Sequence, residues 1–156
     1  MHERFEQITQ KERAAAAKAE HNIHVCVAAS CLSSQSDKVL EAVQAEIKEG
    51  NHKGCLAKGV GCMGLCSRGP LVNVVHKDEK MGETLYQDVT PEDAKALVVA
   101  ASEGKRLEAR VCPTDVPFFQ RQTKIVLENS GRIDPERIEE YVAAGGYEAL
   151  LTAVTE

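Results

Sequence analysis

The chain has 156 residues, a formal net charge of −5 and 43% hydrophobic residues. This length suits one domain with an appendage, and the acidic balance argues against broad nucleic-acid binding. No run of about 18 consecutive apolar residues is present, and the charged N-terminus lacks the apolar centre of a secretory signal. We therefore expect a cytoplasmic protein without a membrane span.

The first half of the chain predicts a helix, a strand and a second helix. Residues 2–20 carry many charges and an alanine run, which indicates a surface helix with little apolar face. Residues 22–28 contain β-branched residues in rough alternation and predict a strand. Residues 36–49 place apolar side chains at helical spacing, and Ser33 and Ser34 are candidate caps for that helix.

Three more strands and a helix are expected next. Residues 56–60, 71–75 and 83–89 read as short strands, and Thr90 begins a helix that runs to about Ser102. This order predicts a small mixed sheet with helices packed on it, which belongs to the α/β (α+β) class. The thioredoxin-like architecture fits this order, although several α+β folds share it.

The character of the chain changes after residue 110. An extended, proline-punctuated stretch leads to a short helix that begins near residues 134–136. Several apolar residues there must pack on the first domain, on a neighbour or on a domain that this chain does not complete: Phe118, Phe119, Ile125, Val126 and Leu127. We therefore divide the chain into an N-terminal helix (residues 1–21), a central domain (residues 22–110) and a tail (residues 111–156).

Four of the six cysteines occur as two closely spaced pairs. Cys26 and Cys31 form a C-x4-C pair at the end of the first strand, and Cys62 and Cys66 form a C-x3-C pair before the third. In a reducing compartment, clustered cysteines are more often metal ligands or redox thiols than disulfides. Pairs on loops that leave strands can converge at one end of a sheet. Four thiolates are what a [2Fe–2S] cluster needs.

The glycine-rich loop around the second pair fits this hypothesis. A cluster held by four thiolates carries negative charge, which backbone N–H groups directed at the sulfurs can offset. Gly59, Gly61 and Gly64 would let the loop wrap the cluster without a Cβ in the way. We expect Lys58 and Arg68, which flank the loop, to add positive potential.

Other interpretations remain open on the residues alone. A structural zinc site of a protein-docking module tolerates these spacings, whereas a disulfide exchanger favours C-x-x-C, which neither pair has. Cys55 could replace a ligand, and Cys112 is expected to be inert. His24 lies on the same strand face as Cys26, but no C-x-H motif supports a histidine ligand.

Two segments resemble a known family. "VCVAASCLSSQSDKVLEAV" and "GVGCMGLCSRGPLVNV" are similar to the thioredoxin-like [2Fe–2S] ferredoxin domain, with its C-x4-C and C-x3-C pattern. That domain occurs in respiratory complex I and at the front of the NADH-binding diaphorase subunit of NAD-reducing hydrogenases and related formate dehydrogenases. The resemblance implies that Cys26, Cys31, Cys62 and Cys66 are the cluster ligands and that the chain transfers single electrons.

The tail adds a second resemblance. "PFFQRQTKIVLENSGRIDPERIEEYVAAGGYEAL" is similar to the segment that leads into the FMN- and NADH-binding domain of the diaphorase subunit. The implied context is a bidirectional, NAD(P)-linked [NiFe] hydrogenase, with a flavoprotein domain and other Fe–S subunits as partners. The glycine-rich FMN and NADH loops and the [4Fe–4S] cysteine motif of that family are missing here. We expect a fragment without a complete catalytic site.

Overall fold

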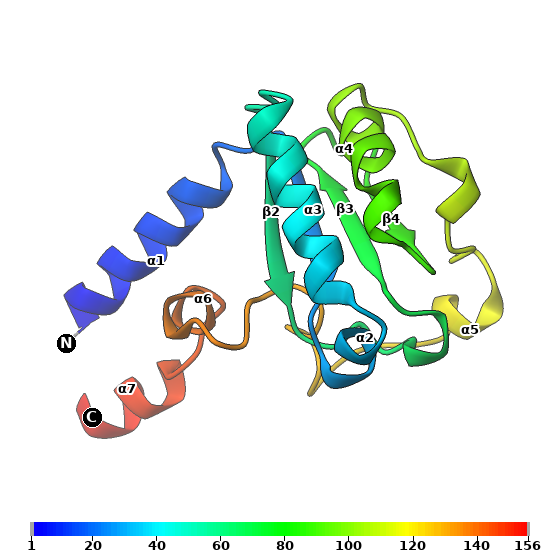
Figure 1. Ribbon diagram of the computed structural model, residues 1–156. Helices are drawn as coiled ribbons and strands as arrows, with labels where there is room; N and C mark the ends of the chain where they lie inside the picture. Colours follow the sequence, from blue (N-terminus) through cyan, green and yellow to red (C-terminus); the bar gives the residue numbers. More distant parts are fainter. Residues whose placement is uncertain (1, 156) are drawn as a thin grey trace.

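The computed structural model describes residues 2–155, which form a four-stranded sheet with helices on both sides (Figure 1). The elements in chain order are α1 (His2–Ala16), β1 (His21–Cys26), α2 (Ala29–Ser33), α3 (Ser36–Glu49), β2 (Cys55–Val60), η1 (Cys66–Arg68), β3 (Val72–His76), β4 (Glu83–Tyr86), η2 (Pro91–Asp93), α4 (Ala94–Ser102), η3 (Glu108–Arg110), α5 (Pro117–Gln120), α6 (Ile138–Ala143) and α7 (Glu148–Thr155).

The strand order is β2-β1-β3-β4. β1 pairs in parallel with β2, while β1 with β3 and β3 with β4 are antiparallel. The crossover through α3 is what makes the β1–β2 pair parallel, because a tight turn can join only antiparallel strands. The expected α/β class, with a small mixed sheet and a thioredoxin-like arrangement, is confirmed.

The main core lies between the sheet and the helices α3 and α4, which cover one face (Figure 1). Alternation along β1 and β3 sends every second side chain into this layer. The following core residues are at most 1% exposed: Ile23, Val25, Val39, Val43, Val72, Val74, Tyr86, Leu97 and Val98. On the other side of the sheet, α1 and α6 border a hollow of about 540 Å³.

The expected helix over residues 36–49 is confirmed as α3, but its expected caps are wrong. Ser33 and Ser34 do not cap it, because residues 29–33 form the separate helix α2. Within α2 the Ser33 hydroxyl donates to the Ala29 carbonyl at 2.9 Å, so it has no role at the next helix. The residue before α3 is Gln35, whose φ of 66° marks the bend between the two helices.

The expected cap at Thr90 is confirmed. The Asp93 carboxylate accepts hydrogen bonds from the Thr90 backbone N–H at 2.8 Å and from its hydroxyl at 3.0 Å. The expected fourth strand over residues 83–89 is shorter, since β4 ends at Tyr86. Asp88 then takes a φ of 51°, which is incompatible with a continuing strand.

The tail returns to the sheet. Its start follows the β4 edge, where the Cys112 N–H donates to the Leu85 carbonyl at 2.8 Å. Further on, α6 packs against α1 and reaches β2 through a Lys58–Glu140 ion pair. The apolar stretch over residues 125–127 nevertheless remains exposed, with Val126 at 94%.

Within residues 2–155, no helix combines the length and the apolar character needed to cross a bilayer.

Two histidines meet at the end of the sheet where β1 begins. His21 Nδ1 and His76 Nδ1 lie 2.8 Å apart, so one ring must donate and the other accept. His76 is 7% exposed, and burial, with a smaller effect of His21, lowers its pKa below the ordinary value. Both observations indicate that the folded state holds His76 neutral.

This pair predicts a stability that falls in mild acid. The unfolded chain takes up a proton on His76 as the pH drops through about 6.5, whereas the folded chain resists until its lower pKa is reached. The free energy of unfolding should therefore decrease below about pH 6.5. Urea unfolding at a series of pH values should show that the free energy of unfolding depends less on pH in His76→Gln than in the original chain. His2→Gln, at an exposed position, is the control and should leave the dependence intact.

Candidate metal centre

The two cysteine pairs lie at one edge of the sheet. Cys26 is the last residue of β1, and Cys62 follows β2 by two residues. Because β1 and β2 are parallel, their carboxyl ends meet at the same edge, which is the lower one in Figure 1. Cys31 lies in α2 and Cys66 begins η1, and both of these short helices are at that edge. All four predicted site residues are thus brought to one end of the fold.

Within this group the thiols keep their pairing. The Sγ atoms of Cys62 and Cys66 are 3.9 Å apart. Cys26 and Cys31 contact each other in a small apolar cluster with Leu71. Cys26 and Cys31 are each 1% exposed, whereas Cys62 is half-buried and Cys66 is exposed. One pair therefore lies inside the protein and the other at its surface.

The surroundings of Cys31 and Cys66 favour the protonated thiol. Burial, with a smaller contribution from the neighbouring Cys26, raises the pKa of the Cys31 thiol to about 12. The Cys66 thiol has a raised pKa because it shares a hydrogen bond with Cys62. Reactive thiols of exchange enzymes need the opposite, a lowered pKa. A bound metal would supply the positive charge that stabilises four thiolates here.

The backbone forms part of the cradle. The Gly64 N–H donates to Cys62 Sγ at 3.4 Å, and the φ of Gly64 is +91°, a conformation that favours glycine. Gly69 was not singled out by the sequence pattern, yet a Cβ on it would lie 2.9 Å from Cys31 Sγ. Gly61, by contrast, has no atom of residues 2–155 within 4 Å of an added Cβ.

The two basic residues that flank the loop are neutralised by acidic partners. Lys58 Nζ forms an ion pair with Glu140 Oε2 at 2.5 Å. Arg68 pairs with Asp88 at 3.1 Å and also donates to Gln87. The expected positive potential at the loop is therefore largely cancelled. Backbone N–H groups and the metal itself remain to offset the charge of the thiolates.

The remaining candidates lie apart from this edge. Cys55 begins β2, at the opposite end of the strand from Cys62, and is buried in the main core. Cys112 is buried beside β4, and burial raises the pKa of its thiol, as expected for an inert residue. His24 Nδ1 is buried without a hydrogen-bond partner, and burial together with Lys58 lowers the pKa of this imidazole to about 4.

The geometry bears on the kind of metal group that fits. Among residues 2–155, no three His, Cys, Asp or Glu side chains come close enough to hold a single ion together. A structural zinc ion takes four ligands at once, whereas each iron of a [2Fe–2S] cluster takes two. Two pairs of sulfur donors at one edge, with a glycine where a Cβ would strike one sulfur, match the two thiolates that each iron of such a cluster takes.

Comparison with known proteins agrees with this arrangement. A family model for the thioredoxin-like [2Fe–2S] ferredoxins matches residues 12–102, which is more than half of the chain. The chain belongs to this family. Its ferredoxins bind a [2Fe–2S] cluster and transfer electrons.

Solved structures of the same kind of ferredoxin share the fold of this chain. Two structures of the thioredoxin-like [2Fe–2S] ferredoxin from Aquifex aeolicus match at 25% sequence identity with a TM-score of 0.51. They cover 60% of this chain, and 96% and 90% of their own chains. The ferredoxin fold is thus present nearly whole, and the family match ends before the tail begins.

The contrast between two glycines gives a direct test of the cradle. Gly69→Ala should sharply reduce the iron and sulfide content of purified protein, because its Cβ would overlap Cys31 Sγ. Crowding of this kind typically costs about 1–3 kcal/mol. Gly61→Ala is the matched control and should retain the cluster, since its Cβ meets open space. Equal iron content in the two variants would show that the loop does not enclose Cys31 as described.

Proposed function

We propose that Cys26, Cys31, Cys62 and Cys66 hold a [2Fe–2S] cluster and that the chain passes single electrons to and from a redox partner. The observation that carries this proposal is the convergence of two cysteine pairs at one edge of the sheet. The spacing of 3.9 Å between the sulfurs of Cys62 and Cys66 supports ligation in pairs. Membership in the ferredoxin family supports the nature of the cofactor.

The chain's own residues would set the conditions of the transfer. A [2Fe–2S] cluster, when bound, accepts and releases one electron at a time. Cys26 and Cys31 would anchor its buried side in the apolar cluster around Leu71, which excludes water. The Gly64 N–H would stabilise the thiolate of Cys62. The exposed Cys66 would give a partner its closest approach.

We propose a finer context as well. The resemblance of residues 117–150 to the segment before an FMN and NADH domain supports the diaphorase module of an NAD(P)-linked [NiFe] hydrogenase. Residues 1–21 would then be an N-terminal helix, residues 22–110 the ferredoxin domain and residues 111–156 the linker and start of the flavoprotein domain. A flavoprotein domain and further Fe–S subunits would be the partners. We propose a cytoplasmic location, because closely spaced cysteine pairs are more often metal ligands than disulfides in a reducing compartment.

Serine substitutions test the cluster assignment. Cys26→Ser, Cys31→Ser, Cys62→Ser and Cys66→Ser should each remove or badly weaken the cluster, because an iron loses one of its two thiolates. The measurements are iron and sulfide analysis and the electron paramagnetic resonance spectrum of dithionite-reduced protein. Cys55→Ser and Cys112→Ser are controls at buried cysteines and should keep the full signal. Colourless protein with one bound zinc would favour a structural zinc module instead.

Electron donors test the finer context. NADH or NADPH alone should leave the visible absorbance of the cluster unchanged, because the chain has no dinucleotide-binding loop of the diaphorase type. Addition of a purified hydrogenase diaphorase flavoprotein should bleach it with one of the two nucleotides. Bleaching that is as fast with the flavoprotein of a formate dehydrogenase or of complex I would contradict the hydrogenase assignment. It would leave the cluster assignment intact.

A further inference from the structure

The segment of residues 130–140 lies outside the matched ferredoxin residues, yet it contacts the loop that carries Cys62. We name it the strap. The Ser130 hydroxyl donates to the Cys62 carbonyl at 2.5 Å. Three residues further on, the Ile133 carbonyl accepts a hydrogen bond from the Gly61 N–H at 3.2 Å. The strap thus satisfies backbone groups on both sides of the Gly61–Cys62 peptide bond.

Packing at this contact is tight. Gly131 is buried and has a φ of +79°, and a Cβ on it would lie 3.0 Å from Met63 Cγ. A larger side chain there would push against the residue that follows Cys62. The turn itself is held by local hydrogen bonds, in which the Arg132 and Ile133 N–H groups donate to the Asn129 carbonyl. The strap therefore presents a preformed surface to the loop.

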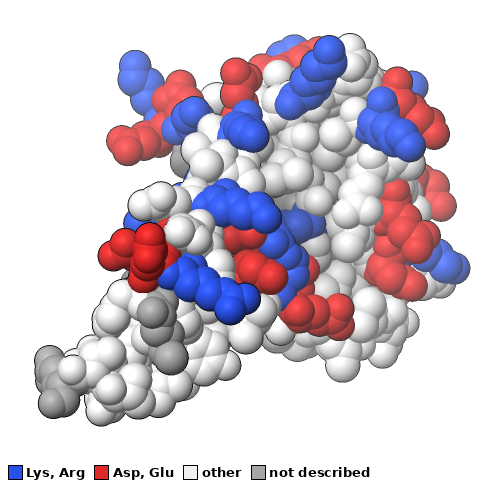
Figure 2. All heavy atoms as spheres, turned by 90° about the vertical axis from the view of Figure 1, so that its left-hand side faces the viewer, with Lys and Arg blue, Asp and Glu red and all other residues white. Residues whose placement is uncertain are grey.

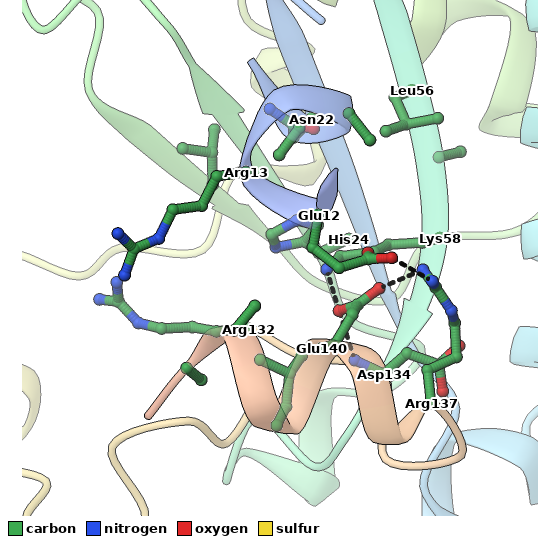
Figure 3. A pocket seen from close by; sticks show the side chains of 17 residues that line it. Glu12, Arg13, Asn22, His24, Leu56, Lys58, Arg132, Asp134, Arg137 and Glu140 are labelled. Atoms are coloured by element: carbon green, nitrogen blue, oxygen red, sulfur yellow. Dashed lines mark hydrogen bonds and ion pairs between the residues drawn. The ribbon is translucent and has the colours of Figure 1, made fainter. Parts of the chain in front are cut away.

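Glu140 anchors the far end of the strap. It is 8% exposed, and its carboxylate accepts from Lys58 Nζ at 2.5 Å and from the Asp134 N–H at 3.0 Å (Figure 3). Arg137 binds the same carboxylate at 3.1 Å and reaches Glu12 of α1 at 2.7 Å. Burial opposes ionisation of Glu140, but the hydrogen bonds from Lys58 and the Asp134 N–H, together with the charges of Lys58 and Arg137, outweigh it and lower the pKa. Glu140 is thus held as a carboxylate.

Lys58 lies two residues before the end of β2, directly upstream of the Cys62 loop. The strap therefore contacts this stretch of chain at two places, the end of β2 and the Cys62 loop. On the face with α1 and α6, charges of both signs are interspersed, as expected for a surface of mutual ion pairs (Figure 2).

From these contacts we propose that the strap positions the Cys62 half of the cluster site, and that Ser130 and Gly131 are positioning residues for it. The inference rests on the proposed function in taking Cys62 as a ligand. Cys62 belongs to the outer pair, which is less buried than Cys26 and Cys31, although Met63 and Leu65 of its loop pack against their apolar cluster. Contacts from the strap, which lies outside the ferredoxin fold, would hold this loop in place where it faces solvent. The positive end of the Ser130 hydroxyl dipole, directed at the Cys62 carbonyl, would also favour the reduced cluster.

The test uses the full, cluster-loaded chain and two readouts other than activity. In Ser130→Ala the amide of Gly61 should exchange its hydrogen about two- to ten-fold faster, the range expected for loss of one hydrogen bond. The reduction potential, from a titration followed by electron paramagnetic resonance, should become more negative, with changed g values. Gly131→Ala, which crowds Met63, should alter the same readouts by displacing the loop.

Two variants separate positioning from general stability. Ser130→Thr keeps the hydroxyl and should restore the exchange rate and potential of the original chain. Ser102→Ala removes a hydroxyl that donates to the Val99 carbonyl at 2.9 Å in α4, and should leave both readouts unchanged. Unchanged exchange and potential in both Ser130→Ala and Gly131→Ala would overturn the inference. Retention of the cluster in Cys62→Ser would instead refute the proposed function, so the two failures are distinguishable.

Discussion

Parallel pairing of β1 and β2 is the constraint on which the rest of the structure depends. It brings the carboxyl ends of two strands to one edge, and each of those ends continues into one cysteine pair. An antiparallel pair would have put Cys26 and Cys62 at opposite ends of the sheet. The crossover through α3 is therefore as necessary to the site as the cysteines, because it makes the parallel pairing possible.

The two cysteine pairs are held in place in different ways. Cys26 and Cys31 lie within the apolar cluster around Leu71. The outer pair is held by Met63 and Leu65, which pack on that cluster, by the Gly64 turn and by polar contacts from the tail. Flanking charge contributes little, since Lys58 and Arg68 are each matched by an acidic side chain. Stabilisation of thiolates must then come from nearby backbone dipoles and from the metal. A backbone dipole acts mainly on the sulfur nearest to it. The two irons of a bound cluster would therefore have different surroundings.

The sequence predicted those features whose signals are local. The cysteine spacings, the Thr90 cap and the strand alternation each lie within a few residues, and they gave the sheet and the candidate ligands. Gly69 was missed because its steric need arises from Cys31, which approaches only after folding. The Ser130–Cys62 and Lys58–Glu140 contacts span 68 and 82 positions, so no periodicity in the sequence could indicate them. The position of α1 and α6 on the second face of the sheet could not be predicted for the same reason.

The exposed thiol of Cys66 is accessible to oxidants in the cell. Surface sulfur that admits a redox partner admits dioxygen and peroxides equally, and oxidation of cysteine follows accessibility. A subunit seated over this edge would act as a shield as well as a conductor. The isolated chain should then be most vulnerable between synthesis and assembly, when its outer thiols have neither iron nor a neighbour.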